Sequence, residues 1–197
     1  MTFNRPTRLS IRRGRLGLPP LLLPFAVLAV SLSLCACAPA PGGSPALQPN
    51  PGQVATSGDC PVGPNLAQCE RSVSLARSGT ARRAIAFAFG QIGKPYSTAD
   101  RLGLNSYDCS GLVWRSYAEA GIDIGANVSS AIVTPGGPRV EIPMNHAEPG
   151  DIVWYPGHVA IALADGNIIE AAKPGTNVRV VSSKYRNFTR AIAISAP

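Results

Sequence analysis

From Asp151 onwards the chain is a series of short β-rich segments separated by turn residues, and this pattern limits the fold more than any other feature. Pro-Gly and Asp-Gly pairs mark the turns, and Asp165-Gly166 between two apolar segments is a strong hairpin signal. Strands joined by such short turns pair antiparallel. The predicted strands are residues 151–155, 158–164, 167–172, 178–182 and 190–195.

Helical patterns precede these strands. Apolar side chains recur at helical spacing from about residue 78 to a stop at Gly93. A second helix is expected to begin at Cys109 or just after it and to end at Gly121, and residues 126–133 predict a short third helix. N-terminal helices packed on an antiparallel sheet of about five strands make an α+β fold.

The first residues of the chain have the layout of an export signal. Basic residues up to Arg15 precede a mostly apolar segment, and small residues follow where cleavage is expected. An uncleaved membrane anchor is the alternative, although prolines in the segment disfavour a spanning helix. The sequence LCAC (34–37) is similar to a bacterial lipobox and predicts lipidation at Cys37, whereas cleavage near ACA (36–38) would release the protein. Either route predicts an exported protein, anchored to the membrane or secreted to the cell wall.

Residues 38–77 follow the predicted signal of residues 1–37 and are rich in Pro, Gly, Ser and Ala. Such a composition predicts a flexible tether, because it offers little apolar surface to bury. Cys60 and Cys69 lie in this region, and in an oxidising compartment we expect them to form a local disulfide. A metal site fits them less well, since no His or further Cys is near. The compact domain is then expected to cover residues 78–197.

The formal net charge of +7 would suit a nucleic acid or a membrane surface as partner. Five arginines before residue 16 carry most of this charge, and basic and acidic residues nearly balance from Ser78 onwards. The predicted domain therefore lacks the basic surface that nucleic-acid binding requires, and we expect no nucleic-acid partner.

The segment YDCSGLVWRSY (107–117) contains the single cysteine of the predicted domain, Cys109. Four roles are open to Cys109: a core thiol, a disulfide partner of one of the two tether cysteines, a metal ligand or a nucleophile. A metal site is disfavoured because the predicted domain has one cysteine and the whole chain has only two histidines. At a helix N-terminus, backbone N–H groups and the helix dipole stabilise a thiolate, and the small neighbours Ser110 and Gly111 would leave the sulfur open to substrate. These features favour a nucleophile.

A nucleophilic thiol needs a base, and His146 and His158 are the candidates. His146 lies in a polar loop, where we expect a solvated side chain. His158 opens a predicted strand and could project toward Cys109, although a structural histidine explains its position equally well. Glu170 lies on the next strand, where a carboxylate among apolar residues needs a partner unless it faces solvent. It could orient the imidazole of His158.

These segments resemble the NlpC-type cell-wall cysteine peptidases, a papain-like family of bacteria. The resemblance rests on YDCSGLV, PGDIVWY, GHVAIAL and NIIEA, in this order, within about residues 80–195. It implies that Cys109 is the nucleophile, His158 the base and Glu170 the third polar residue, which is most often His in the family. Family members usually follow GKPY with Trp-Gly-Gly, and residues 97–99 are Ser-Thr-Ala here. This departure bears on the shape of the substrate groove.

The resemblance also implies a substrate and its contacts. Tyr96 would line the active site, and Asp108 and Ser110 would shape the substrate site beside the nucleophile. The implied reaction is hydrolysis of peptidoglycan stem peptides between D-γ-glutamyl and a diamino acid, through a thioester, with no metal or organic cofactor. We expect a monomer. The alternatives are a non-catalytic wall-binding lipoprotein and an amidase that acts on the N-acetylmuramoyl-L-alanine bond.

Overall fold

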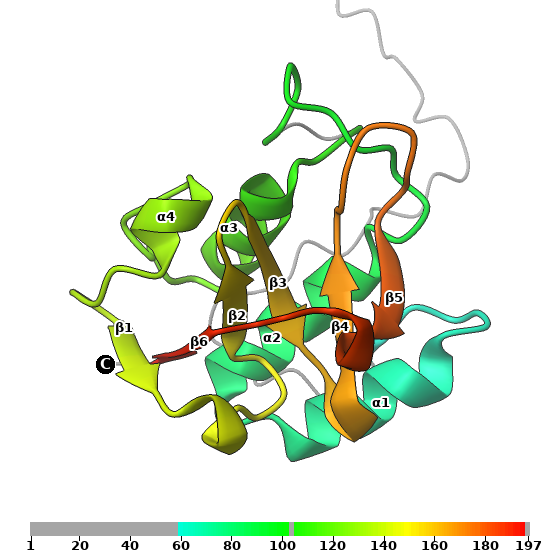
Figure 1. The fold of residues 1–197 in the computed structure, drawn as a ribbon. Helices are drawn as coiled ribbons and strands as arrows, with labels where there is room; N and C mark the ends of the chain where they lie inside the picture. Colours follow the sequence, from blue (N-terminus) through cyan, green and yellow to red (C-terminus); the bar gives the residue numbers. More distant parts are fainter. Residues whose placement is uncertain (1–58, 103–104, 196–197) are drawn as a thin grey trace, which may run out of the picture. The chain divides into compact units, whose positions relative to one another are not determined.

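The computed structural model describes residues 59–102 and 105–195. Helices come first along the chain and strands follow, as Figure 1 shows. The helices are α1 (Leu66–Leu75), α2 (Gly79–Phe89), α3 (Cys109–Glu119) and α4 (Ser129–Ile132). The strands are β1 (Arg139–Ile142), β2 (Ile152–Tyr155), β3 (His158–Ala162), β4 (Asn167–Glu170), β5 (Arg179–Ser182) and β6 (Arg190–Ile194). The short 3₁₀ helices are η2 (Met144–His146), η3 (Ala164–Gly166) and η4 (Ser183–Tyr185).

All six strands form one antiparallel sheet in the order β1-β6-β2-β3-β4-β5. The α+β class is confirmed, and each of the five predicted strands contains a strand of the sheet. The sixth, β1, was not predicted. It lies at an edge, pairs only with β6 and has no buried residue, so its sequence lacks the apolar pattern by which a strand is recognised.

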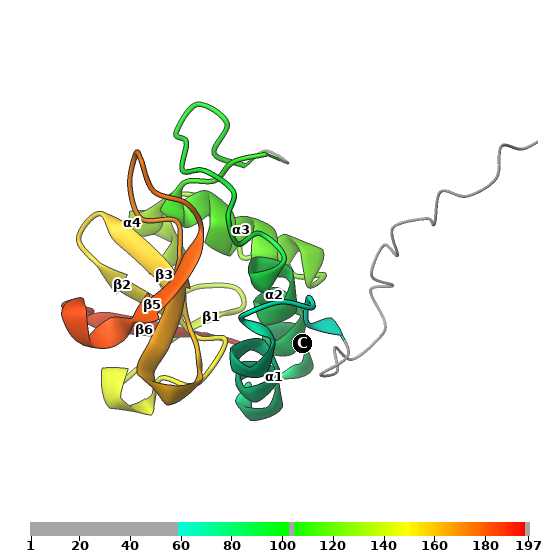
Figure 2. The same ribbon diagram turned by 90° about the vertical axis from the view of Figure 1, so that its right-hand side faces the viewer.

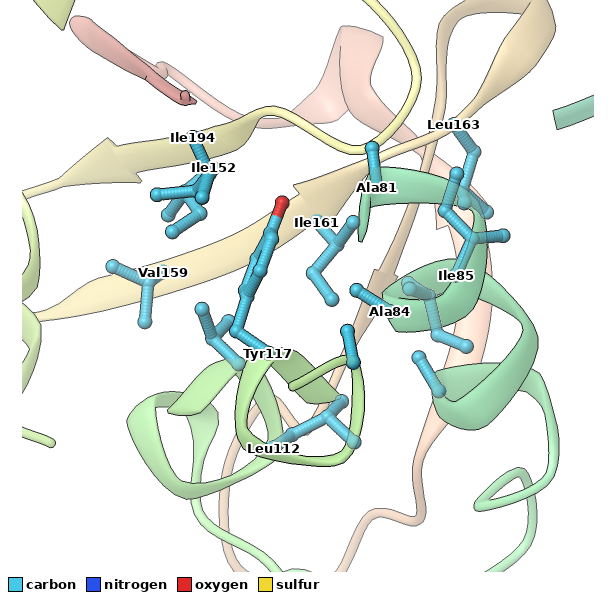
Figure 3. Close-up of a cluster of buried hydrophobic side chains, with 14 of the residues drawn as sticks. Ala81, Ala84, Ile85, Leu112, Tyr117, Ile152, Val159, Ile161, Leu163 and Ile194 are labelled. Atoms are coloured by element: carbon cyan, nitrogen blue, oxygen red, sulfur yellow. The ribbon is translucent and has the colours of Figure 1, made fainter. Parts of the chain in front are cut away.

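Helices α1, α2 and α3 lie on one side of the sheet, as the turned view in Figure 2 shows. The core fills the space between them, with Ile85 and Leu112 from the helices facing Val159 and Ile161 from β3 (Figure 3). Burying a Leu, Ile or Val side chain stabilises a fold by about 1.5–3 kcal/mol. The hydroxyl of Tyr117 donates a hydrogen bond to the carbonyl of Gly150 within this core. This packing fixes α3, and with it the direction of its N-terminus, against the sheet.

The folded domain begins earlier than expected. Helix α1 lies inside the predicted tether of residues 38–77, so the predicted boundary at residue 78 is wrong. Only Cys69, Ser72 and Val73 of this helix are buried, which explains why its apolar pattern was too weak to predict a helix. Residues 38–58, the predicted signal and Cys37 lie outside the described residues. Within the described ranges, no helix has the length and apolar character needed to cross a bilayer.

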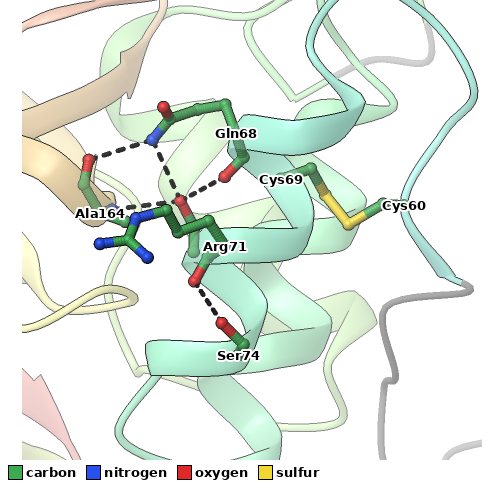
Figure 4. Close-up of a disulfide and its surroundings, with 7 residues drawn as sticks. Cys60, Gln68, Cys69, Arg71, Ser74 and Ala164 are labelled. Atoms are coloured by element: carbon green, nitrogen blue, oxygen red, sulfur yellow. Dashed lines mark hydrogen bonds between the residues drawn. A yellow bond between two sulfur atoms is a disulfide. The ribbon is translucent and has the colours of Figure 1, made fainter.

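Helix α1 is held by a disulfide and by polar contacts. Cys60 and Cys69 are joined by a disulfide, and the amide of Gln68 donates to the carbonyl of Ala164 at 3.0 Å (Figure 4). The hydroxyl of Ser72 accepts a hydrogen bond from the backbone N–H of Ala164 at 3.1 Å. A disulfide restricts the unfolded chain, and hydrogen bonds to buried backbone groups fix position. The two hydrogen bonds attach α1 to the turn between β3 and β4, and the disulfide joins the helix to the segment that precedes it.

Candidate active site

Cys109 is the first residue of α3, as the helix-start prediction required. Asp108 is the N-cap, and its side chain accepts a hydrogen bond from the backbone N–H of Gly111 at 2.6 Å. Such a cap satisfies one N–H of the first turn and leaves others directed past the helix end. Cys109 is a free thiol with 9% of its surface exposed. A single thiol therefore lies where the helix N-terminus stabilises negative charge.

His158 is the first residue of β3, directly after the Pro156-Gly157 turn that joins it to β2. Its Nε2 atom lies 3.0 Å from Oε2 of Glu170, the last residue of β4. This bond occupies Nε2 and leaves Nδ1 as the second ring nitrogen, and Cys109 lies near enough to raise the pKa of the imidazole. Strands β3 and β4 pair antiparallel, and this hairpin brings the histidine and the glutamate together. The turn of the hairpin contains Asp165, which has a positive φ of 59° and is the one non-glycine residue with positive φ in the described part of the chain.

The charges around His158 favour its protonated form. Burial on its own would lower the pKa of this imidazole. Hydrogen bonds to Cys109 and Glu170, and the negative charges of these two groups, outweigh burial and raise the pKa of His158 to about 8. An imidazolium of this kind can stabilise a thiolate and can donate a proton to a leaving group.

Glu170 is fully buried and ionised. Burial would raise the pKa of its carboxyl, but hydrogen bonds from His158 and Arg186, and their positive charges, lower that pKa to about 2. Arg179 on β5 also donates to Oε1 at 3.2 Å. The alternative of a solvent-facing glutamate is thus wrong. A buried carboxylate is tolerated when it is paired and hydrogen-bonded, and this one has three partners.

Two arginines and one aromatic ring complete this side of the site, and none of the three was predicted from the sequence. Arg179 is the cross-strand partner of Glu170, so the register of the β4–β5 hairpin would have identified it. Arg186 follows η4, and no sequence pattern links it to Glu170. Tyr155 was known only as a strand residue, and its ring centroid lies 5.1 Å from that of His158.

Tyr96 lies close to the thiol, where the resemblance placed it. Its backbone N–H donates to the carbonyl of Thr176 at 2.9 Å, and it bridges to Tyr107, two residues before Cys109. Burial raises the pKa of Tyr96, the negative charges of Cys109 and Asp108 raise it further, and Arg101 opposes them. The phenol therefore stays neutral and can donate a hydrogen bond near the sulfur.

Asp108 and Ser110, the other expected substrate contacts, are bound to each other and to Arg101. The hydroxyl of Ser110 donates to Asp108 Oδ1 at 3.0 Å, and Nε of Arg101 donates to Asp108 Oδ2 at 2.8 Å. Arg101 also donates to Ser110 at 3.3 Å and to the backbone carbonyl of Asn127. Both residues therefore build the wall beside Cys109 through a guanidinium that the sequence analysis did not identify.

Gly111 has a role beyond the expected one of leaving the sulfur open to substrate. A Cβ atom at this position would lie 1.8 Å from the carbonyl oxygen of Arg101. The glycine therefore gives room to the loop that precedes α3.

The remaining features lie outside this centre. His146 is exposed on η2, as expected of a solvated histidine. A cavity of about 410 Å³ is lined by Met144, Phe188 and Arg186 among others, but by neither Cys109 nor His158. In the part of the chain that the structure describes, no group of three or more His, Cys, Asp or Glu side chains is placed to hold a metal ion.

Comparison with known proteins connects this geometry to one family. The model of the NlpC/P60 family matches residues 93–193, about half of the chain. Dipeptidyl-peptidase 6 of Lysinibacillus sphaericus is 33% identical over 95 residues, which are 48% of this chain and 34% of that protein. Peptidoglycan endopeptidase RipA of Mycobacterium tuberculosis is 32% identical over 115 residues, 50% of this chain and 24% of RipA. The chain thus spans about a third of the length of the first of these curated relatives and about a quarter of the second.

Solved structures give the same result. RipB, a peptidoglycan hydrolase of Mycobacterium tuberculosis, aligns with a TM-score of 0.52 and 26% identity over 68% of this chain and 74% of that chain. The NlpC/p60 domain of the peptidoglycan hydrolase SagA aligns with a TM-score of 0.51 and 30% identity over 58% of this chain and 98% of that one. Three solved structures of RipA carry a mutation at a cysteine, a histidine and a glutamate, respectively. Their TM-scores are 0.51, 0.51 and 0.52, and their identities to this chain are 28%, 28% and 27%. Each alignment covers 59% of this chain and 63% of the RipA chain.

Proposed function

Because the chain belongs to the NlpC/P60 family, we propose that it is a cysteine endopeptidase that hydrolyses peptidoglycan stem peptides. The observation that carries the proposal is that Cys109, His158 and Glu170 lie together, with the thiol near the imidazole and 3.0 Å between His158 Nε2 and Glu170 Oε2. RipA, named a peptidoglycan endopeptidase, has been mutated at residues of these same three types. That coincidence supports the assignment of Cys109, His158 and Glu170 as the catalytic residues.

The reaction would be acyl transfer through a thioester. His158 takes the thiol proton of Cys109, and the thiolate sulfur attacks the scissile carbonyl carbon. The backbone N–H of Cys109, in the first turn of α3, has no acceptor within the helix and would bind the oxyanion that forms. The imidazolium of His158 then protonates the leaving amine as the C–N bond breaks. Water, deprotonated by His158, hydrolyses the thioester and releases the thiol.

Glu170 would keep the imidazole in the productive orientation. Its carboxylate accepts from Nε2–H, so Nδ1 is the nitrogen that exchanges a proton with sulfur. Tyr96, Asp108 and Ser110, with Arg101 behind them, would form the wall that positions the stem peptide. The preferred bond would be that between D-γ-glutamyl and a diamino acid, as in the family that the sequence resembles.

Digestion of purified sacculi, with mass spectrometry of the released fragments, tests this proposal. The wild-type protein is expected to release peptides cut after D-γ-glutamyl, and Cys109→Ala to release none. His158→Ala should be equally inactive, whereas His146→Ala, which changes the other of the two histidines, should retain activity. Fragments cut at the muramoyl-L-alanine bond would instead identify an amidase. Binding to sacculi without any release by the wild type would indicate a wall-binding protein.

We also propose that the protein is exported and lipidated at Cys37. The disulfide between Cys60 and Cys69 supports export, because such bonds persist in oxidising compartments. Mass spectrometry of the native N-terminus should find a lipid-modified cysteine, and Cys37→Ala should move the protein from the membrane fraction to the medium. A native N-terminus that begins after residue 37 would refute lipidation and leave secretion.

A further inference from the structure

The carboxylate of Glu170 binds Arg186 through both of its oxygens. Oε2 accepts from His158 Nε2 at 3.0 Å and from Arg186 Nε at 3.3 Å. Oε1 accepts from Arg186 Nη2 at 2.5 Å and from Arg179 Nη2 at 3.2 Å. Arg186 therefore binds both Oε2, which also binds His158, and Oε1. Arg179 binds only Oε1.

A guanidinium that bonds both oxygens fixes the plane of a carboxylate, because its N–H groups form a rigid fork. Rotation of the Glu170 carboxylate would break one of the two Arg186 bonds and would move Oε2 away from Nε2 of His158. The side chain of Arg186 is 27% exposed and that of Arg179 is 43% exposed, while that of Glu170 is fully buried. Of the two arginines, Arg186 is the less screened by solvent and the better placed to orient the carboxylate.

The same guanidinium also opposes the charge that Glu170 brings to the imidazole. The groups that face His158 are Cys109 from α3, Glu170 from β4 and the ring of Tyr155 from β2. Arg186 and Arg179 face Glu170 from the other side. Burial raises the pKa of Tyr155, so its phenol carries no charge near neutral pH. A cation beside the carboxylate weakens the attraction between that carboxylate and an imidazolium.

We propose that Arg186 is a positioning residue that acts through Glu170: it holds Oε2 on Nε2 of His158 and limits how strongly the carboxylate stabilises the imidazolium. The consequence is an imidazolium that is stable enough to form with the thiolate and still acidic enough to protonate the leaving amine. This catalytic consequence rests on the proposed function, whereas the effect of Arg186 on the protonation of His158 does not depend on which reaction the protein catalyses.

NMR titration of His158 in the Cys109→Ala background tests the proposal without any enzymatic activity. Arg186→Gln retains a donor but removes the charge, so the pKa of His158 is expected to rise by about one unit. Arg186→Lys keeps the charge and should change it little. Arg179→Gln should give a smaller rise, since its guanidinium is more exposed. Arg190→Gln removes a surface ion pair with Glu141 and is the matched control, with no shift expected. An unchanged or lowered pKa in Arg186→Gln would overturn the proposal.

Kinetics with Cys109 present give the second readout. The alkaline limb of kcat/KM is expected to move to higher pH in Arg186→Gln, in step with the NMR titration. Arg186→Lys should keep the position of that limb but lower kcat more than it changes KM, because the ammonium cannot form the fork. If Arg186→Gln lost activity but the alkaline limb of its kcat/KM profile stayed at the same pH, Arg186 would have only a structural role. Absence of hydrolysis by the wild type would refute the proposed function, and the NMR result would still decide the role of Arg186.

Discussion

The carbonyl oxygen of Arg101 lies 1.8 Å from the point where a side chain at position 111 would place its Cβ atom. Gly111 is the third residue of α3, and the side chain of Arg101 binds Asp108 and Ser110 on either side of the thiol. The absence of a side chain at one position thus allows a loop to pack against the helix start and to deliver a guanidinium beside Cys109. The wall of the candidate site depends on this contact.

Gly111→Ala should therefore damage both stability and activity. The added methyl group must displace backbone, and overpacking of this kind costs about 1–3 kcal/mol. Displacement of Arg101 would also weaken its bond to Asp108, so kcat/KM should fall. Urea denaturation and sacculus digestion measure the two effects. Gly90→Ala is the matched control, since that glycine has φ −65° and a Cβ there would lie 3.2 Å from its nearest neighbour. Equal losses of stability and activity in the two variants would contradict the predicted clash at position 111.

Glu170→Gln should lower activity more than it disturbs the fold. The amide can still contact Nε2 of His158, but it cannot stabilise an imidazolium and can favour the wrong tautomer. Losses of roughly 10²–10⁴-fold in kcat are typical when such an orienting carboxylate is neutralised. Two arginines also lose their charged acceptor, which should lower the free energy of unfolding by about 1–3 kcal/mol. Steady-state kinetics and urea denaturation measure both, and full activity in Glu170→Gln would remove Glu170 from the mechanism.

The stability of the protein should depend on pH through the His158–Glu170 pair. The pKa of Glu170 is lowered from 4.5 to about 2, so its contribution is present above pH 4.5 and is lost as the pH falls toward 2. The pKa of His158 is raised from 6.5 to about 8, so its contribution is present below pH 6.5 and is lost as the pH rises through 8. This pair should therefore stabilise the fold most between about pH 4.5 and 6.5.

Urea denaturation across this pH range tests the linkage. The free energy of unfolding of the wild type should fall on both sides of the plateau, and Glu170→Gln should flatten both slopes. If the free energy of unfolding of the wild type rose from pH 6.5 to 8 relative to that of Glu170→Gln, the predicted linkage to His158 would be contradicted. Activity should also decline above about pH 8, because the imidazolium that protonates the leaving amine is lost there.

Removal of the disulfide should destabilise the domain without abolishing catalysis. The two cysteines are nine residues apart, and closing a loop of this length stabilises a fold by about 2–3 kcal/mol in the chain-entropy model. The double variant Cys60→Ser/Cys69→Ser should lose about this much in urea denaturation and keep its activity at low temperature. Since α1 also bonds to Ala164, next to the β3–β4 turn, a large loss of kcat would show instead that α1 supports the position of His158.

The sequence predicted the helix that begins at Cys109, because apolar side chains at helical spacing and a glycine at the end are local signals. It also predicted the strand that begins at His158 and the next strand, which contains Glu170, because a turn pair separates two short apolar segments. Helix α1 was missed, since few of its residues are buried and its polar side chains bind a turn far along the chain. Strand β1 was missed because an exposed edge strand needs no apolar alternation.

The sequence by itself determined which residues the candidate site contains: a single thiol at a helix N-terminus, a histidine at a strand start, and a glutamate on the next strand. The tertiary structure decided which charges surround them. Arg186 and Arg101 reach Glu170 and Asp108 through contacts between side chains from separate segments, and a guanidinium on a long flexible side chain has no periodicity that marks its target. The electrostatics of the site therefore become visible only when the chain is folded.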